Sequence, residues 1–199
     1  MALAKLSECT SSLNLIRPNA PSSALLPCCD RLFHSAGDCA RLWKQLGCDY
    51  NVVQISPGPL HGRLRVDHQD GILLVSMQAD QALLVEGTRH PRWLPFTIEH
   101  SDNYREHRHF GESLSPHTLA GFNTKMTETL MRTSPGGNCI GAVLVDRRRV
   151  DIWADLMNAH EVSDRMEHNN KAILSPTVHR KLRQLMVLPA WKGADVPKP

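Results

Sequence analysis

The chain has 199 residues, of which 41% are hydrophobic and 22% charged, with a formal net charge of +3. These values exclude a disordered chain, which combines low hydrophobicity with high net charge, and an obvious nucleic-acid surface, which needs a clustered basic stripe. No apolar stretch reaches the roughly 20 residues that span a bilayer, and the N-terminus lacks the apolar core of a secretory signal. The sequence therefore predicts a cytoplasmic protein with no membrane partner.

The six cysteines have neither CxxC spacing nor the pattern of a disulfide framework. We expect reduced thiols, as is usual in a cytoplasm. No cofactor is indicated.

Residues 1–29 are rich in serine and contain Pro18, Pro21 and Pro27, which prevent a long helix. We expect an extended N-terminal arm there. Residues 31–34 then predict a short strand. Asp38 is a candidate cap for a helix that Gly47 ends.

The next fifty residues have the pattern of β-structure. Turns at 56–59 and 69–71 contain Pro-Gly and Asp-Gly, which suit tight connections between strands. Pro95 indicates an edge strand or a bulge. Short strands at even spacing favour a sandwich or a small barrel over a parallel α/β sheet. The predicted strands are 52–55, 62–67, 72–77, 82–85 and 93–98.

The remainder becomes helical after one more buried strand at 140–145. Residues 100–118 have the composition of a long polar loop, and 124–132 fit either a helix or a strand. A last helix begins with Ser175 as its cap and Pro176 in its first turn. The fold class predicted is α+β, mainly β: a small antiparallel barrel or jelly roll followed by C-terminal helices.

Three residues are candidate metal ligands: His107, His109 and Glu112. Alternate residues of a strand project to one face, and a nearby carboxylate would complete a facial site. The order is similar to that of cupin enzymes, although the cupin pattern has a wider His-to-Glu gap. A hydrated loop with incidental histidines is the competing interpretation.

Other catalytic signals are missing from the sequence. No GxSxG elbow occurs, and residues 57–62 lack the glycine spacing and lysine of a phosphate loop. Arg147–Arg149 is typical of a solvated helix face, with a phosphate contact as the alternative. We therefore expect a protein that is not an enzyme.

Two stretches carry a family resemblance. Residues 33–43 and then Gln54-Ile55, Gly58, Leu60, Gly62 and Leu64 resemble the N-terminal domain of AraC-like transcription regulators, as do 86–91 and 93–96. The resemblance covers residues 31–100. It implies a cupin-like barrel at 30–146 that senses a ligand, and a helical dimerisation segment at 147–188.

The family places two helix-turn-helix motifs over about 100 further residues. Only twelve residues follow Val187, and we expect 189–199 to be a disordered tail. DNA binding would thus require a missing C-terminal half.

The resemblance implies an effector-binding and dimerisation domain, with a small-molecule effector and a homodimer partner. Met77, Trp93 and Phe96 are candidate ligand-binding residues, with core packing as the alternative. Val178, Leu182 and Leu185 form an apolar stripe that suits a partner helix as well as an intramolecular one. A metal-dependent cupin-like enzyme and a protein-interaction module remain the alternative functions.

Overall fold

The computed structural model describes residues 28–69, 71–100 and 106–186. It confirms the α+β, mainly β class, with two antiparallel sheets and four helices in this part of the chain. The predicted arm, apart from Cys28 and Cys29, and the predicted tail lie outside the described residues.

The first sheet has seven strands, and its order places a long hydrophobic strand in the centre. The order is β1 (Cys29–Phe33), β3 (Gly62–Gln69), β4 (Ile72–Ala79), β11 (Asn138–Asp146), β6 (Trp93–Glu99), β9 (Thr118–Ala120) and β12 (Lys171–Ile173). The second sheet has five strands. Their order is β2 (Asp49–Gln54), β5 (Leu83–Thr88), β10 (Glu128–Arg132), β7 (Arg108–His109) and β8 (Glu112–Ser113).

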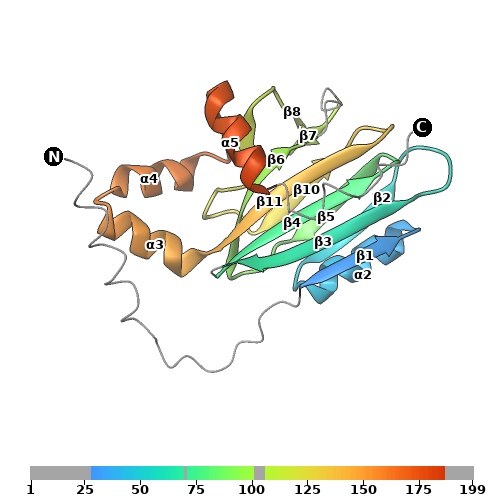
Figure 1. Cartoon of the computed structure of the whole chain (residues 1–199), viewed down its shortest axis with the longest axis horizontal. Helices are drawn as coiled ribbons and strands as arrows, with labels where there is room; N and C mark the ends of the chain where they lie inside the picture. Colours follow the sequence, from blue (N-terminus) through green and yellow to red (C-terminus); the bar gives the residue numbers. More distant parts are fainter. Residues whose placement is uncertain (1–27, 70, 101–105, 187–199) are drawn as a thin grey trace.

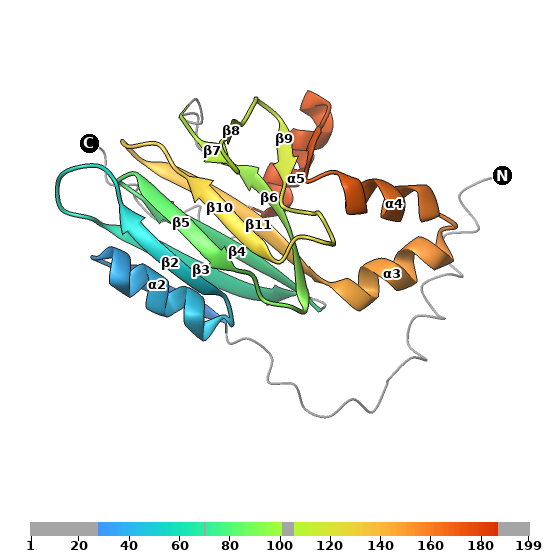
Figure 2. The ribbon, with the colours of Figure 1, turned by 180° about the vertical axis from the view of Figure 1, so that it is seen from behind.

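Of the four helices in the described residues, two pack against the sheets and two extend beyond one end of them (Figures 1 and 2). The four helices are α2 (Ala36–Gln45), α3 (Arg147–Leu156), α4 (His160–His168) and α5 (Pro176–Met186). Figures 1 and 2 show the five-stranded sheet on one face of the seven-stranded sheet and α5 on the other. Helix α2 contacts β2, β1 and β3, so it joins the two sheets along one side.

The main core lies between the sheets. Leu64 and Met77 from the first sheet pack in one cluster with Leu83 and Val85 from the second. Five successive residues of β4, from Leu73 to Met77, are buried. A strand that is covered on both faces has this continuous apolar character.

Of the predicted barrel or jelly roll, the closed barrel is not formed, because the two sheets do not close on each other within the described residues. The first sheet ends at β1 and β12, and the second at β2 and β8. Closure needs the outermost strands to pair, and no such pair forms here.

Two local predictions need correction, and one stretch that fitted either a helix or a strand is now assigned. The cap of α2 is Ser35, whose Oγ accepts from the Asp38 amide at 3.0 Å, so the helix begins before Asp38; Gly47, at φ 74°, follows its end as predicted. The ambiguous stretch 124–132 contains strand β10. Pro95 is not on an edge strand, because β6 lies between β11 and β9; the bridge to β9 is at Thr97 alone, so the amide that Pro95 lacks is not needed there.

The segment 147–186 is mostly helical, as expected, but it also contributes β12 to the first sheet. Helix α5 begins at Pro176, and the Ser175 hydroxyl accepts from the Val178 amide at 3.3 Å. The predicted cap and first helical residue are therefore confirmed.

Candidate functional site

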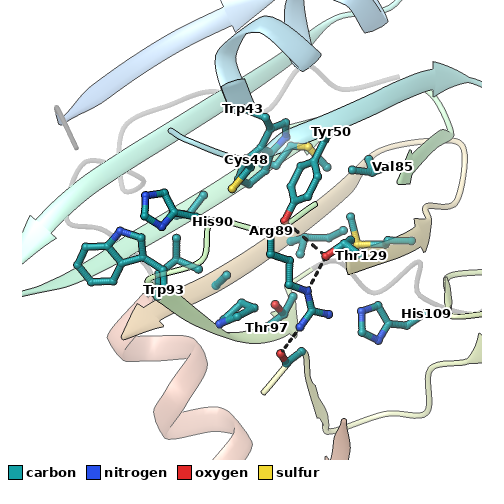
Figure 3. Close-up of a pocket in the computed structure, with 18 residues that line it drawn as sticks. Trp43, Cys48, Tyr50, Val85, Arg89, His90, Trp93, Thr97, His109 and Thr129 are labelled. Carbon is teal, nitrogen blue, oxygen red and sulfur yellow. Dashed lines mark hydrogen bonds between the residues drawn. The ribbon is translucent and has the colours of Figure 1, made fainter. Parts of the chain in front are cut away.

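A cavity of about 80 Å³ lies between the two sheets, and Figure 3 shows the side chains around it. Its lining comes from both sheets, from Trp43 on α2 and from the loops that follow α2, β5 and β9. The lining residues are Trp43, Cys48, Tyr50, Val75, Met77, Val85, Arg89, His90, Trp93, Pro95, Thr97, His109, Gly121, Thr129, Met131, Ile140, Ala142 and Leu144. Apolar side chains predominate, as in small-ligand sites.

Strand alternation explains the apolar walls. On β11 the residues Ile140, Ala142 and Leu144 face the cavity at every second position. On β6 the same alternation turns Trp93, Pro95 and Thr97 inward. These two strands are neighbours in the first sheet, so together they form one wall.

Among the residues that line the cavity, Arg89 is the only one from the group Lys, Arg, Asp and Glu. It follows the last residue of β5, and its amide donates to the Thr127 carbonyl at 2.8 Å. The side chain is only 4% exposed. As Figure 3 shows, its Nε donates to Thr129 Oγ1 and its Nη1 to the Gly121 carbonyl, each at 2.8 Å.

The positive charge of Arg89 has no acidic partner among the described residues. A guanidinium has five N–H donors, and the two bonds above leave three of them without a partner there. Burial lowers the pKa of Arg89, and the positive charge of Arg147 lowers it further. Arginine remains charged even so, because its ordinary pKa is above 12.

The polar groups around Arg89 are neutral at pH 7. The Tyr50 hydroxyl lies 3.4 Å from Thr129 Oγ1, and burial raises the pKa of Tyr50. Burial also lowers the pKa of His109 to about 4, with a further contribution from Arg89. The Nδ1 of His109 lies 3.4 Å from the side-chain nitrogen of Asn170. The cavity thus combines one buried cation, neutral hydrogen-bonding groups and apolar walls.

The three predicted ligand-binding residues separate into two groups. Met77 and Trp93 line the cavity, whereas Phe96 does not. Phe96 is on the other face of β6, where its ring stacks on Phe122 with centroids 6.1 Å apart. It belongs to a second cluster with Leu94 and Met166, so core packing accounts for Phe96.

The three candidate metal ligands do not form one group, although His109 and Glu112 are register partners across β7 and β8. His107 is 1% exposed and lies just outside β7, with its Nδ1 2.5 Å from Glu99 Oε2. His109 faces the cavity, and the exposed Glu112 forms an ion pair with Lys171. Strand β7 is too short to hold both histidines on one face. No group of three or more His, Cys, Asp or Glu residues in the described ranges is placed to hold a metal ion.

The predicted apolar stripe lies on α5. Val178 is 46% exposed, and Leu182 is half-buried. The face that packs against the protein contains the buried residues His179 and Met186. Leu185 lies within the helix bounds.

Sequence reasoning missed Arg89, Tyr50 and Thr129 as site residues. Arg89 follows a Glu-Gly-Thr stretch that is typical of an exposed turn, so nothing in the neighbouring sequence indicates that Arg89 is buried. His109 was selected, but as a metal ligand.

Among the described residues, no helix combines the length and the apolar character needed to cross a bilayer. Comparison of the chain with models of protein families, with curated proteins and with solved structures finds no match.

Proposed function

We propose that the protein is a cytoplasmic ligand-sensing and dimerisation domain similar to the N-terminal half of an AraC-like regulator. The observation that carries this proposal is the cavity between the sheets, with apolar walls and a few polar groups. The thiols Cys39 and Cys48 are both buried and free, which suits a reducing compartment. No catalytic step is assigned to the site.

Strand β11 connects the cavity to the C-terminal helices. Its inward residues, such as Ala142, line the cavity, while the strand also contacts α3 and α5. Gly141 lies close to His100: a Cβ at Gly141 would come within 2.2 Å of His100 Nε2. Arg183 on α5 donates to the His100 carbonyl. A ligand that shifts β11 would therefore move His100, and with it the hydrogen bond that holds α5.

Sensing then follows from a population shift. In this mechanism β11 and α5 together adopt two positions, and a ligand that binds one of them more tightly raises the population of that state. The shift in the equilibrium cannot exceed the difference between the ligand's binding free energies for the two states. Because Val178 on α5 is exposed, the helix presents an apolar contact to a second copy of the chain. Ligand binding would thus change the dimerisation equilibrium.

The test has two measurements on the full chain. A thermal-shift screen with small metabolites should find a compound that raises the unfolding temperature, because a ligand that binds only the folded state stabilises it. Sedimentation should show a dimer whose dissociation constant changes with that compound. A screen in which no compound alters unfolding would contradict the sensing role.

The dimer contact is tested by Val178→Asp. Placing a carboxylate in an apolar contact should convert the dimer to a monomer without unfolding the domain, which circular dichroism checks. Val162→Asp is the matched control, since Val162 on α4 is exposed to a similar degree. If both variants, or neither, lose the dimer, α5 is not the contact.

A further inference from the structure

Arg89 buries a positive charge that its hydrogen-bond partners do not neutralise. Its two hydrogen bonds go to a hydroxyl and a carbonyl, neither of which carries a charge. An unpaired charge in the interior costs free energy, so buried guanidinium groups are normally paired with an anion. Its remaining donors lie at a cavity that has space for a ligand.

We propose that the cavity binds a small monocarboxylate with a compact apolar body, and that the carboxylate is held by Arg89. This inference rests on the sensing role proposed above and adds the chemical class of the effector. The planar guanidinium matches a carboxylate with two parallel N–H···O bonds. The ligand thereby supplies the anion that the protein does not.

The charge around the cavity favours one negative charge on the ligand. Arg89 is the lining's only charged group at pH 7, because His109 is neutral there. Arg147, the other nearby cation, donates to the Thr124 and Met126 carbonyls. A phosphate dianion would therefore keep a charge without a partner, whereas a monocarboxylate is neutralised.

The size and walls of the cavity restrict the apolar body. A single water needs about 10–15 Å³ on the same measure, so 80 Å³ holds roughly half a dozen heavy atoms. Met77, Trp93 and Ile140 form apolar walls, and the guanidinium lies beside Thr129. A branched acid of four or five carbons, such as isobutyrate or isovalerate, fits this description.

The first experiment uses the unmodified protein. Isothermal titration calorimetry compares isobutyrate, isovalerate and benzoate with the neutral isobutyramide and with inorganic phosphate. We expect saturable binding of at least one carboxylate, with about 100-fold weaker binding of isobutyramide, which lacks the charge that pairs with Arg89. Phosphate that binds as tightly as the best carboxylate would overturn the assignment.

The second experiment changes the arginine. Arg89→Met substitutes a shorter, unbranched side chain without charge, so it should weaken carboxylate binding about 100-fold and amide binding much less. Arg89→Lys keeps the positive charge but not the pair of parallel N–H donors, so it should weaken carboxylate binding less than Arg89→Met does. Arg132→Met is the control, because it removes an exposed arginine of β10. Carboxylate binding to Arg89→Met at the affinity of the unmodified protein would refute the inference.

The two proposals fail in different ways. If the metabolite screen finds only neutral ligands, the sensing role stands and the carboxylate assignment is wrong. If no compound of any charge binds, both are wrong. Should Arg89→Met not fold, the difference between isobutyrate and isobutyramide on the unmodified protein still decides the question.

Discussion

Filling the cavity from β11 gives the sharpest test that it is a binding site. Ala142 lines the cavity, and its register partners are Val75 on β4 and Thr97 on β6. Both partners also line the cavity. A leucine at position 142 would therefore extend into space that the sensing role reserves for a ligand.

The magnitude follows from the atoms added. Ala142→Leu adds three carbons, each worth about 0.8 kcal/mol when buried, or roughly 2.4 kcal/mol in total. The leucine side chain loses rotamer freedom on burial, which reduces this stabilisation by about 0.5–1 kcal/mol, and imperfect packing reduces it further. We expect a net stabilisation of about 1–2 kcal/mol, which raises the unfolding temperature by about 2–8 °C in a chain of this size.

The assay is calorimetric unfolding with and without the best ligand from the screen. The variant should unfold at a higher temperature and should no longer respond to the ligand. Val143→Leu is the matched control, because Val143 points to the opposite face of the same strand and should leave the response intact. A lower unfolding temperature together with an unchanged ligand response would show that the ligand binds elsewhere.

Two further predictions concern stability. Leu83→Ala removes a fully buried side chain of β5, the strand between β2 and β10, and should cost about 2–5 kcal/mol in urea unfolding. A loss under 1 kcal/mol would show that Leu83 is not a core residue. Burial lowers the pKa of both His100 and His109 to about 4, so the unfolded chain binds more protons between pH 4 and 6.5. The free energy of unfolding should therefore fall as the pH drops through this window, and His109→Gln should make the fall shallower. Equal slopes for the variant and the unmodified protein would contradict the buried state of His109.

The order of elements was largely predictable because strands and turns have local signals. The alternating residues of β3 and the Asp-Gly connection to β4 specify a hairpin, and the register pairs Gln69 with Ile72. Helix α5 was predictable from Ser175 and Pro176 for the same reason. Each of these features depends on residues a few positions apart.

The face of each residue was not predictable when both faces of a strand are covered. Trp93 and Phe96 both have the character of a core or ligand-binding residue, yet they lie on opposite faces of β6. Only the packing of the second sheet on one face, and of the second cluster on the other, separates them. The same limit applies to His107 and His109, which alternation placed on one face although β7 begins only after His107.

The sequence by itself determined the succession of strands and helices, since hydrophobic period and turn chemistry are short-range properties. The tertiary structure alone decided that the sheets do not close within the described residues and that a cavity lies between them. It also decided that Arg89 is buried without an acidic partner in the described residues. These depend on contacts between strands that are far apart in the chain, such as the approach of β10 and the 121 loop to the end of β5. The surroundings of a charged side chain decide what it can bind, and local sequence does not record those surroundings.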